Sequence, residues 1–186
     1  MKSSEPFQNN HLFAVLLGGR AVGCKVELHD VAFAVGPSLE DTYPQLLDQW
    51  FGEAHGLHMD AYARVDQVAG YQVTLRPDAP RRTEPRLYFV NIGGYRAGEF
   101  GERHAYTLLA AANKSEAKKT ARQTLLPNHD SVHKDDLYDV DDVLEVRGAG
   151  DLHVHLTPDA AAENPPVTNG YFPLPRSVIA AWLEKR

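Results

Sequence analysis

Two stretches of the chain, LFAVLLGG at residues 12–19 and LYFVNIGG at residues 87–94, decide the expected fold. Each is a short apolar run that ends at a pair of glycines, a pattern typical of a buried β-strand followed by a turn. The pairs begin at Gly18 and Gly93, which are 75 residues apart. A strand ending that recurs in this way predicts that one structural unit is written twice in the chain.

Polar residues recur at the same spacing. The ungapped matches that follow the glycine pairs are Glu27 with Glu102, His29 with His104, His58 with His133, Asp60 with Asp135, and Val65-Asp66 with Val140-Asp141. Chance matches among common residues such as Gly and Val do not account for four polar pairs in one register. The sequence therefore predicts a tandem duplication.

Both copies predict the same order of elements: strand, strand, helix, strand, strand. The first copy has expected strands near residues 12–17, 28–35, 59–68 and 71–75, and the second has them near 87–92, 104–111, 138–146 and 152–156. Ser38 is expected to cap the first helix by accepting from the amide of Asp41. Trp50 and Phe51 are expected on the apolar face of that helix.

A unit with one helix cannot cover both faces of its own sheet, so the two units are expected to pair across a pseudo-two-fold axis. The predicted fold class is α+β, with antiparallel sheet, helices on one side and an additional C-terminal helix. The expected parts, with the repeats packing as one domain, are a flexible N-terminus (1–11), repeat 1 (12–75), a linker (76–86), repeat 2 (87–156), and a Pro-rich arm with the last helix (157–186). That helix is expected from Val178 to Lys185, with Ser177 as its cap.

Composition narrows the classes of partner. The chain of 186 residues is 43% apolar and carries a formal charge of −6, with no run of Lys or Arg longer than two, so a nucleic-acid partner is not expected. No apolar run is long enough to span a membrane, and the first residues lack the apolar core of a secretory signal. A single cysteine, Cys24, fits a reducing compartment. We expect a cytoplasmic protein without a membrane partner, and its oligomeric state stays open.

The strand-Gly-Gly element, the Glu-x-His spacing and the segment EDTYPQL at residues 40–46 resemble a bacterial family numbered 1543 among the domains of unknown function. The segments LYFVNIGGY at 87–95 and EFGERHAY at 99–106 resemble a second copy of it. The resemblance covers residues 12–112 and implies a bacterial cytosolic protein with tandem copies. It implies no activity, so no catalytic residue is carried over.

The repeated Glu-x-His pairs are the first candidate site. Glu27 and His29, like Glu102 and His104, are two residues apart on a predicted strand, so both side chains of a pair face the same way. A carboxylate beside an imidazole fixes the tautomer of the histidine and raises its basicity. If the two copies face each other, these groups converge on one cleft. Alternatively, each pair only braces its glycine-rich loop, because buried polar groups need partners with or without a ligand.

A second set would complete a metal site. With His58 and Asp60 in the first copy, and His133 and Asp135 in the second, each repeat has two histidines and two carboxylates, a ligand set that zinc or iron accepts. No metal motif with a fixed local spacing is present, and the strands must meet in space. Arg20, beside the backbone amides of Gly18 and Gly19, is a separate candidate for holding a phosphate.

Three classes of function remain. The chain, which has nine histidines, is most simply a binding module whose pseudo-symmetric polar cleft takes a small molecule or a protein partner. The alternative is a small enzyme that uses the same residues in acid–base or metal-assisted chemistry. The third is a scaffold in which the repeated polar groups hold loops in place. Catalytic residues, and any cofactor other than a divalent metal, stay open.

Overall fold

The structure, a computed structural model, describes residues 9–95, 98–125 and 138–186. The elements of the first repeat are, in chain order, β1 (His11–Gly19), β2 (Leu28–Gly36), the short 3₁₀ turn η1 (Glu40–Thr42), α1 (Tyr43–Gln49), β3 (His58–Arg64), β4 (Gln67–Val68) and β5 (Tyr71–Arg76). Those of the second repeat are β6 (Arg86–Gly94), β7 (Arg103–Ala111), α2 (Lys114–Leu125), β8 (Tyr138–Glu145), β9 (Gly148–Ala149) and β10 (Leu152–Pro158). The C-terminal arm adds β11 (Thr168–Pro173) and α3 (Arg176–Leu183).

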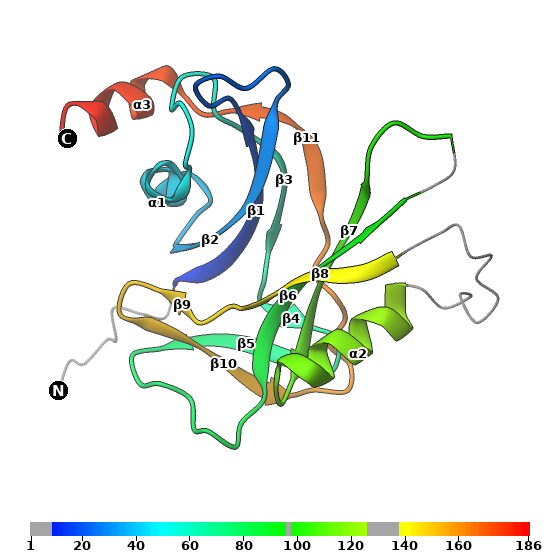
Figure 1. Cartoon of the computed structure of the whole chain (residues 1–186). Helices are drawn as coiled ribbons and strands as arrows, with labels where there is room; N and C mark the ends of the chain where they lie inside the picture. Colours follow the sequence, from blue (N-terminus) through cyan, green and yellow to red (C-terminus); the bar gives the residue numbers. More distant parts are fainter. Residues whose placement is uncertain (1–8, 96–97, 126–137) are drawn as a thin grey trace, which may run out of the picture.

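The sheet of the first repeat has the strand order β11-β3-β1-β2, and α1 and α3 cover one of its faces (Figure 1). Alternate residues of β1, namely Phe13, Val15 and Leu17, point to that face and join a core with Leu46 and Leu47 of α1. The period of two in a strand turns the intervening residues to the opposite face. That opposite face carries no helix.

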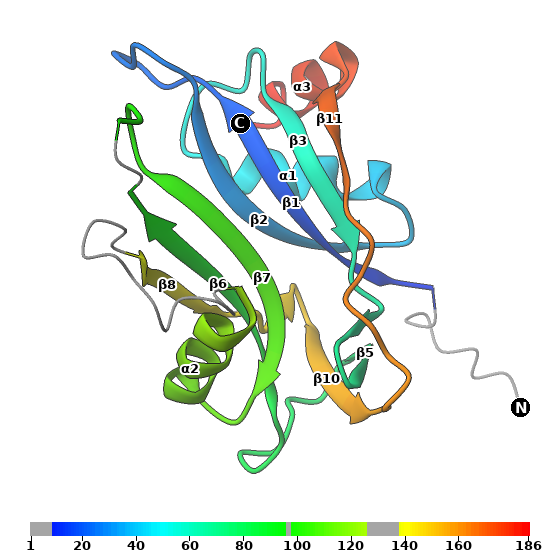
Figure 2. The same cartoon turned by 90° about the vertical axis from the view of Figure 1, so that its right-hand side faces the viewer.

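The sheet of the second repeat has the order β7-β6-β8, and α2 covers one face of it (Figure 2). Tyr88, Val90 and Ile92 of β6 form a core with Ala117 and Ala121 of α2. Figures 1 and 2 show the helix-free faces of the two sheets turned toward each other, with the helices on the outside.

The two repeats meet in a third sheet of order β4-β5-β10-β9, to which each repeat contributes a hairpin. In the antiparallel pairing of β5 with β10, Thr74 lies opposite His155, and Val73 and Leu75 lie opposite Leu156 and Val154. This pairing is symmetric about Thr74 and His155, as a pseudo-two-fold axis requires. A core that includes Leu12 and Val65 of one repeat and Leu87 and Val146 of the other lies beside this sheet. The predicted fold class, α+β with two repeats and a C-terminal helix, is confirmed.

The single repeat offset of 75 residues is correct for the first two strands and wrong for the third. Gly18 pairs with His29 and Gly93 with His104, which is the predicted match. On the other side, however, Gly18 pairs with His58, whereas Gly93 pairs with Asp139, so the offset becomes 81 residues. The same offset relates the backbone hydrogen bonds from Val65 to Leu12 and from Val146 to Leu87. The second repeat therefore has six more residues before its third strand.

The first helix follows the predicted cap, because the amide of Asp41 donates to Ser38 Oγ at 3.3 Å. Trp50 is buried, but Phe51 is 59% exposed, so its assignment to the apolar face was wrong. The backbone is already extended at Trp50, which follows the last residue of α1, so helical periodicity no longer sets the direction of the next side chain.

The last helix docks on the first repeat of its own chain. It begins at Arg176 with Pro175 as its N-cap, and not at Val178 with Ser177 as the cap, because the fixed φ of proline suits the start of a helix. Ile179 is buried in the core beside α1. The indole of Trp182 donates to Asp48 Oδ1 at 2.9 Å. Among the described residues, no helix is long and apolar enough to cross a membrane.

Asp159 ties the arm to the turn between β4 and β5. Its carboxylate accepts from the side chain of Gln72 at 2.8 Å and from the amide of Ala161 at 3.0 Å. These two hydrogen bonds, the first being the stronger cause, lower the pKa of Asp159 because they favour the charged form.

Candidate functional site

Four polar side chains of the first repeat meet at the end of β1, on the helix-free face of its sheet. Gly18 lies between its two strand neighbours, with His29 on β2 and His58 on β3 directly opposite. A β-bulge between Leu16 and Leu17 leaves Asp60 without a direct partner on β1. Bulges of this kind redirect a side chain, here toward the histidines.

Gly18 makes this meeting sterically feasible. A Cβ atom at this position would lie 2.5 Å from His58 Nε2 and 2.6 Å from Asp60 Oδ2. Such distances are shorter than any ordinary non-bonded contact, so a larger residue would displace one of the two side chains. The first glycine of the repeated pair therefore keeps space for the polar groups.

The four groups contact one another through their nitrogen and oxygen atoms. His58 Nε2 lies 3.2 Å from Glu27 Oε1 and 3.4 Å from Asp60 Oδ1. His29 Nε2 lies 3.0 Å from Asp60 Oδ2 and 3.5 Å from Glu27 Oε1. Glu27, His58 and Asp60 each offer one ligand atom within 4.8 Å of the other two. The structure thus brings together all four predicted residues of the first repeat.

His58 is the deepest member of the cluster, with 2% of its surface exposed. Its Nδ1 lies 2.9 Å from the carbonyl oxygen of Gly56, and because a carbonyl only accepts, Nδ1 carries the proton. In the neutral ring, Nε2 then presents its lone pair to the two carboxylates. Neither Nε2 nor Asp60 Oδ2 has a hydrogen-bond partner, although both atoms are buried.

The remaining members are more exposed. The side chains of His29 and Glu27 are 45% and 43% exposed, so they form the solvent side of the cluster. The ring of Tyr171, from the C-terminal arm, lies against His58 with 4.5 Å between ring centroids. The sequence analysis missed the contributions of Gly56 and Tyr171, because neither residue has a counterpart signal in the other repeat.

The second repeat places its Glu-x-His pair differently. Glu102 Oε2 and His104 Nε2 are 3.9 Å apart, and His104 Nδ1 lies 3.2 Å from Asn91 Oδ1. Among the side chains that the structure describes, no ion pair joins this pair to the cluster of the first repeat. His133 and Asp135 lie outside the described residues. The backbone register gives Asp139 the position that His58 has in the first repeat, so the predicted match of His58 with His133 was wrong.

An aromatic row continues from His104 along the helix-free face of the second sheet. The ring of His104 is parallel to that of Tyr106, and Tyr106 stacks on Phe89 with 5.5 Å between centroids. Burial, and to a lesser extent the carboxylate of Asp30 on β2, raise the pKa of Tyr106. The influence of Asp30 indicates that β2 and β7 approach each other across the space between the repeats.

Arg20, the candidate for a phosphate, does not join the cluster. Its guanidinium is exposed and donates to the carbonyl of Lys25 at 3.4 Å, within the same loop. Its own carbonyl accepts from the amide of Glu53 at 2.6 Å. These contacts hold the β1–β2 loop in place.

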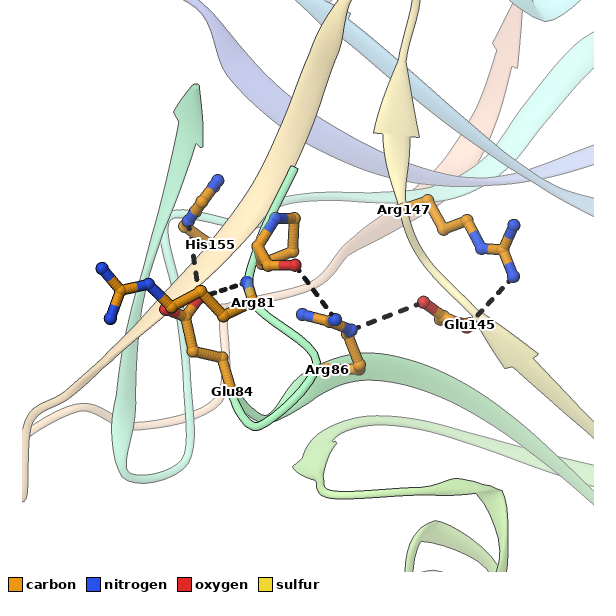
Figure 3. Close-up of polar contacts among 7 residues, drawn as sticks. Arg81, Glu84, Arg86, Glu145, Arg147 and His155 are labelled. Carbon is orange, nitrogen blue, oxygen red and sulfur yellow. Dashed lines mark hydrogen bonds and ion pairs between the residues drawn. The ribbon is translucent and has the colours of Figure 1, made fainter. Parts of the chain in front are cut away.

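A second polar cluster surrounds the segment that links the repeats (Figure 3). Buried His155 lies 2.6 Å through Nε2 from the carbonyl of Asp78 and 3.8 Å through Nδ1 from Glu84. Arg86 donates to the carbonyl of Pro80 at 3.2 Å and approaches Glu145 at 3.8 Å. Most of these contacts go to the linker itself, so we interpret this cluster as a brace that fixes the linker to β10 and β8.

The fold and the site define the class of the protein: a mixed α+β protein built from two tandem repeats, with one four-residue polar cluster in the first. The chain matches the family described as Domain of Unknown Function (DUF1543) over residues 24–75 and 99–147. The two matched segments begin in equivalent loops of the two repeats. The chain belongs to this family.

One solved structure in particular is similar to the whole chain. The crystal structure of protein Il1583 from Idiomarina loihiensis is 37% identical in sequence, with a TM-score of 0.69. The match covers 90% of this chain and 99% of that chain. No curated protein matches the sequence.

Proposed function

We propose that the protein binds a divalent transition-metal ion, zinc being the simplest candidate, through Glu27, His58 and Asp60, with His29 on the solvent side. The observation that carries the proposal is the buried Nε2 of His58, which has no hydrogen-bond partner and faces two carboxylates. Three acceptors that face one another repel unless a cation lies between them.

The tautomer of His58 supports a metal rather than a proton. Metal-bound histidines commonly donate their second ring N–H to a backbone carbonyl, as Nδ1 of His58 does to Gly56. If a proton occupied Nε2, a directed hydrogen bond to Glu27 or Asp60 would be expected. Both carboxylates are near enough, yet neither forms one.

The distances between ligand atoms also suit a metal ion. In a tetrahedral zinc site with bonds of about 2.0–2.2 Å, neighbouring ligand atoms are about 3.3–3.6 Å apart. The four contacts of the cluster range from 3.0 to 3.5 Å. Two imidazoles and two carboxylates form a ligand set for zinc, and iron also accepts it.

A metal-assisted hydrolase is the second candidate, favoured by the exposure of His29. Three deeper ligands, with a fourth that is 45% exposed, leave one side of the ion open to exchange. An ion with an open position lowers the pKa of its bound water and supplies a nucleophile. His29, which lies 3.0 Å from Asp60, would then accept a proton from that water.

The test is the stoichiometry of metal binding, measured by equilibrium dialysis of the full chain against Zn²⁺ followed by elemental analysis. We expect one equivalent per chain, and loss of at least tenfold in affinity in the Glu27→Gln and Asp60→Asn variants. Asp66→Asn is the matched control, because Asp66 also contacts a histidine, His11 at 2.7 Å, on a different part of the sheet.

Less than about a tenth of an equivalent in the unmodified protein would overturn the proposal. Equal zinc affinity in Glu27→Gln, Asp60→Asn and Asp66→Asn would also overturn it, since binding would then lie elsewhere. If the cluster only braces the loop, Glu27→Gln lowers the melting temperature without any change in metal content.

A further inference from the structure

A cavity of about 460 Å³ lies between the helix-free faces of the two sheets. Ala14, Leu16 and Val31 form part of its wall in the first repeat, and Phe89, Tyr106 and Leu108 form part of it in the second. Its volume is within the range of about 300–1,000 Å³ typical of sites for small molecules, which are mostly apolar with a few polar groups.

The strand register places this cavity directly beside the proposed metal site. Leu16, which lines the cavity, pairs with Val31 on one side and Ala61 on the other. Gly18, two residues further along β1, pairs with His29 and His58 in the same way. Residues two apart on a strand share a face and lie about 7 Å apart. The apolar row and the polar row are therefore neighbours on one surface.

Charge decides what kind of molecule could occupy both rows. Without a metal ion, Glu27 and Asp60 make the polar row acidic, and a carboxylate would be repelled. With a divalent ion, the two carboxylates are neutralised and the ion attracts an oxygen donor. A head group that is anionic would therefore bind only when the ion is present.

We propose, on the basis of the metal site inferred above, that the cavity binds a small monocarboxylate whose apolar body lies between the sheets and whose carboxylate coordinates the ion. The body contacts the row of Leu16, Val31 and Ala61 on one side and the stacked rings of Phe89 and Tyr106 on the other. Tyr106 is 44% exposed, so its ring is available to a ligand in the absence of any rearrangement.

Octanoate and octan-1-ol are suitable probes, because they share an apolar chain and differ in the head group. Calorimetric titration of the full chain is carried out with Zn²⁺ and after removal of metal by a chelator. We expect octanoate to bind the zinc-loaded protein at least tenfold more tightly than the metal-free protein. Octanol is expected to show no such difference.

Ala61→Leu tests the position of the body, since the added atoms enter the cavity one row from the metal. This variant should keep its zinc affinity and lose at least tenfold in affinity for octanoate. Ala160→Leu is the control, because it adds the same atoms at an exposed position of the arm. Circular dichroism of both variants verifies that they fold.

Failure of this inference is distinguishable from failure of the metal proposal. Zinc binding with equal octanoate affinity in the loaded and metal-free protein, or in Ala61→Leu and the unmodified chain, would overturn the ligand and leave the metal site intact. If zinc does not bind, both proposals fall, because the carboxylate then has no ion to coordinate.

Discussion

Gly18→Ala is the substitution that most directly tests the geometry of the proposed site. Gly18 lies in β1 and is not one of the glycines with positive φ, so the backbone accepts alanine without strain. The added methyl group would meet His58 Nε2 at 2.5 Å and Asp60 Oδ2 at 2.6 Å. The perturbation is therefore confined to the atoms that are proposed to bind the metal.

The expected magnitude follows from how far these atoms must move. An ordinary contact of a carbon atom is about 3.5 Å, so His58 Nε2 must withdraw by roughly 1 Å. The ring cannot do so freely, because it is buried and its Nδ1–H is bonded to Gly56. We expect a loss of about 1–3 kcal/mol in the free energy of unfolding from overpacking. Zinc affinity is expected to fall by about 10–100-fold, as when the surroundings of a ligand are disturbed.

The adjacent glycine provides a matched control. A Cβ atom at Gly19 would lie 2.9 Å from Trp50 and 3.5 Å from Leu57, on the helix-covered face of the same strand. Gly19→Ala should therefore cost a similar amount of stability and leave zinc affinity unchanged. Urea denaturation of the metal-free proteins measures the first quantity, and competition with a fluorescent zinc chelator measures the second.

The reasoning would be refuted if Gly18→Ala bound zinc as tightly as the unmodified protein while Gly19→Ala confirmed that such a methyl group is felt. An equal loss of zinc affinity in both variants would also refute it, because the effect would then be one of general stability.

Three further predictions concern the rest of the fold. His155→Ala should lower the free energy of unfolding by about 2–4 kcal/mol, since it leaves a cavity beside the linker and removes a hydrogen bond, whereas the more exposed His153→Ala should change it by less than about 1 kcal/mol; equal effects in urea denaturation would contradict the brace. Ile179→Ala should cost about 2–4 kcal/mol, because Ile179 is 4% exposed, while Leu183→Ala, at a position 53% exposed, should cost little; a folded, equally stable Ile179→Ala variant would show that α3 is not held by this core. Asp159→Asn should be less stable than the unmodified chain at pH 7, since the lowered pKa of Asp159 means that the charged form stabilises the folded state. That contribution is present above the ordinary carboxyl pKa of 3.8 and is lost as the pH falls through the lowered value, so melting curves of the two proteins should converge in acid.

Much of the fold could be predicted from the sequence because strand signals are local. The glycine pairs after β1 and β6, and the alternation that places Glu27 and His29 on one face, depend only on residues close together in the chain. Burial of Phe51 could not be predicted, because the chain leaves the helix just before it. The match of His58 with His133 failed for a related reason. A longer connection before the third strand changes no local pattern, and Val-Asp recurs by chance at the shorter spacing.

By itself, the sequence determined that the chain is duplicated, where most strands lie, and that the first repeat has two histidines and two carboxylates. Only the tertiary structure decided that these four groups meet. His29 and His58 belong to strands that are separated in the chain, and they become neighbours because both pair with the same residue of β1. That residue is Gly18, whose missing side chain leaves the space in which the histidines and carboxylates approach. Contacts of this kind depend on strand order and register, which are settled by packing of the whole domain rather than by any local stretch of sequence.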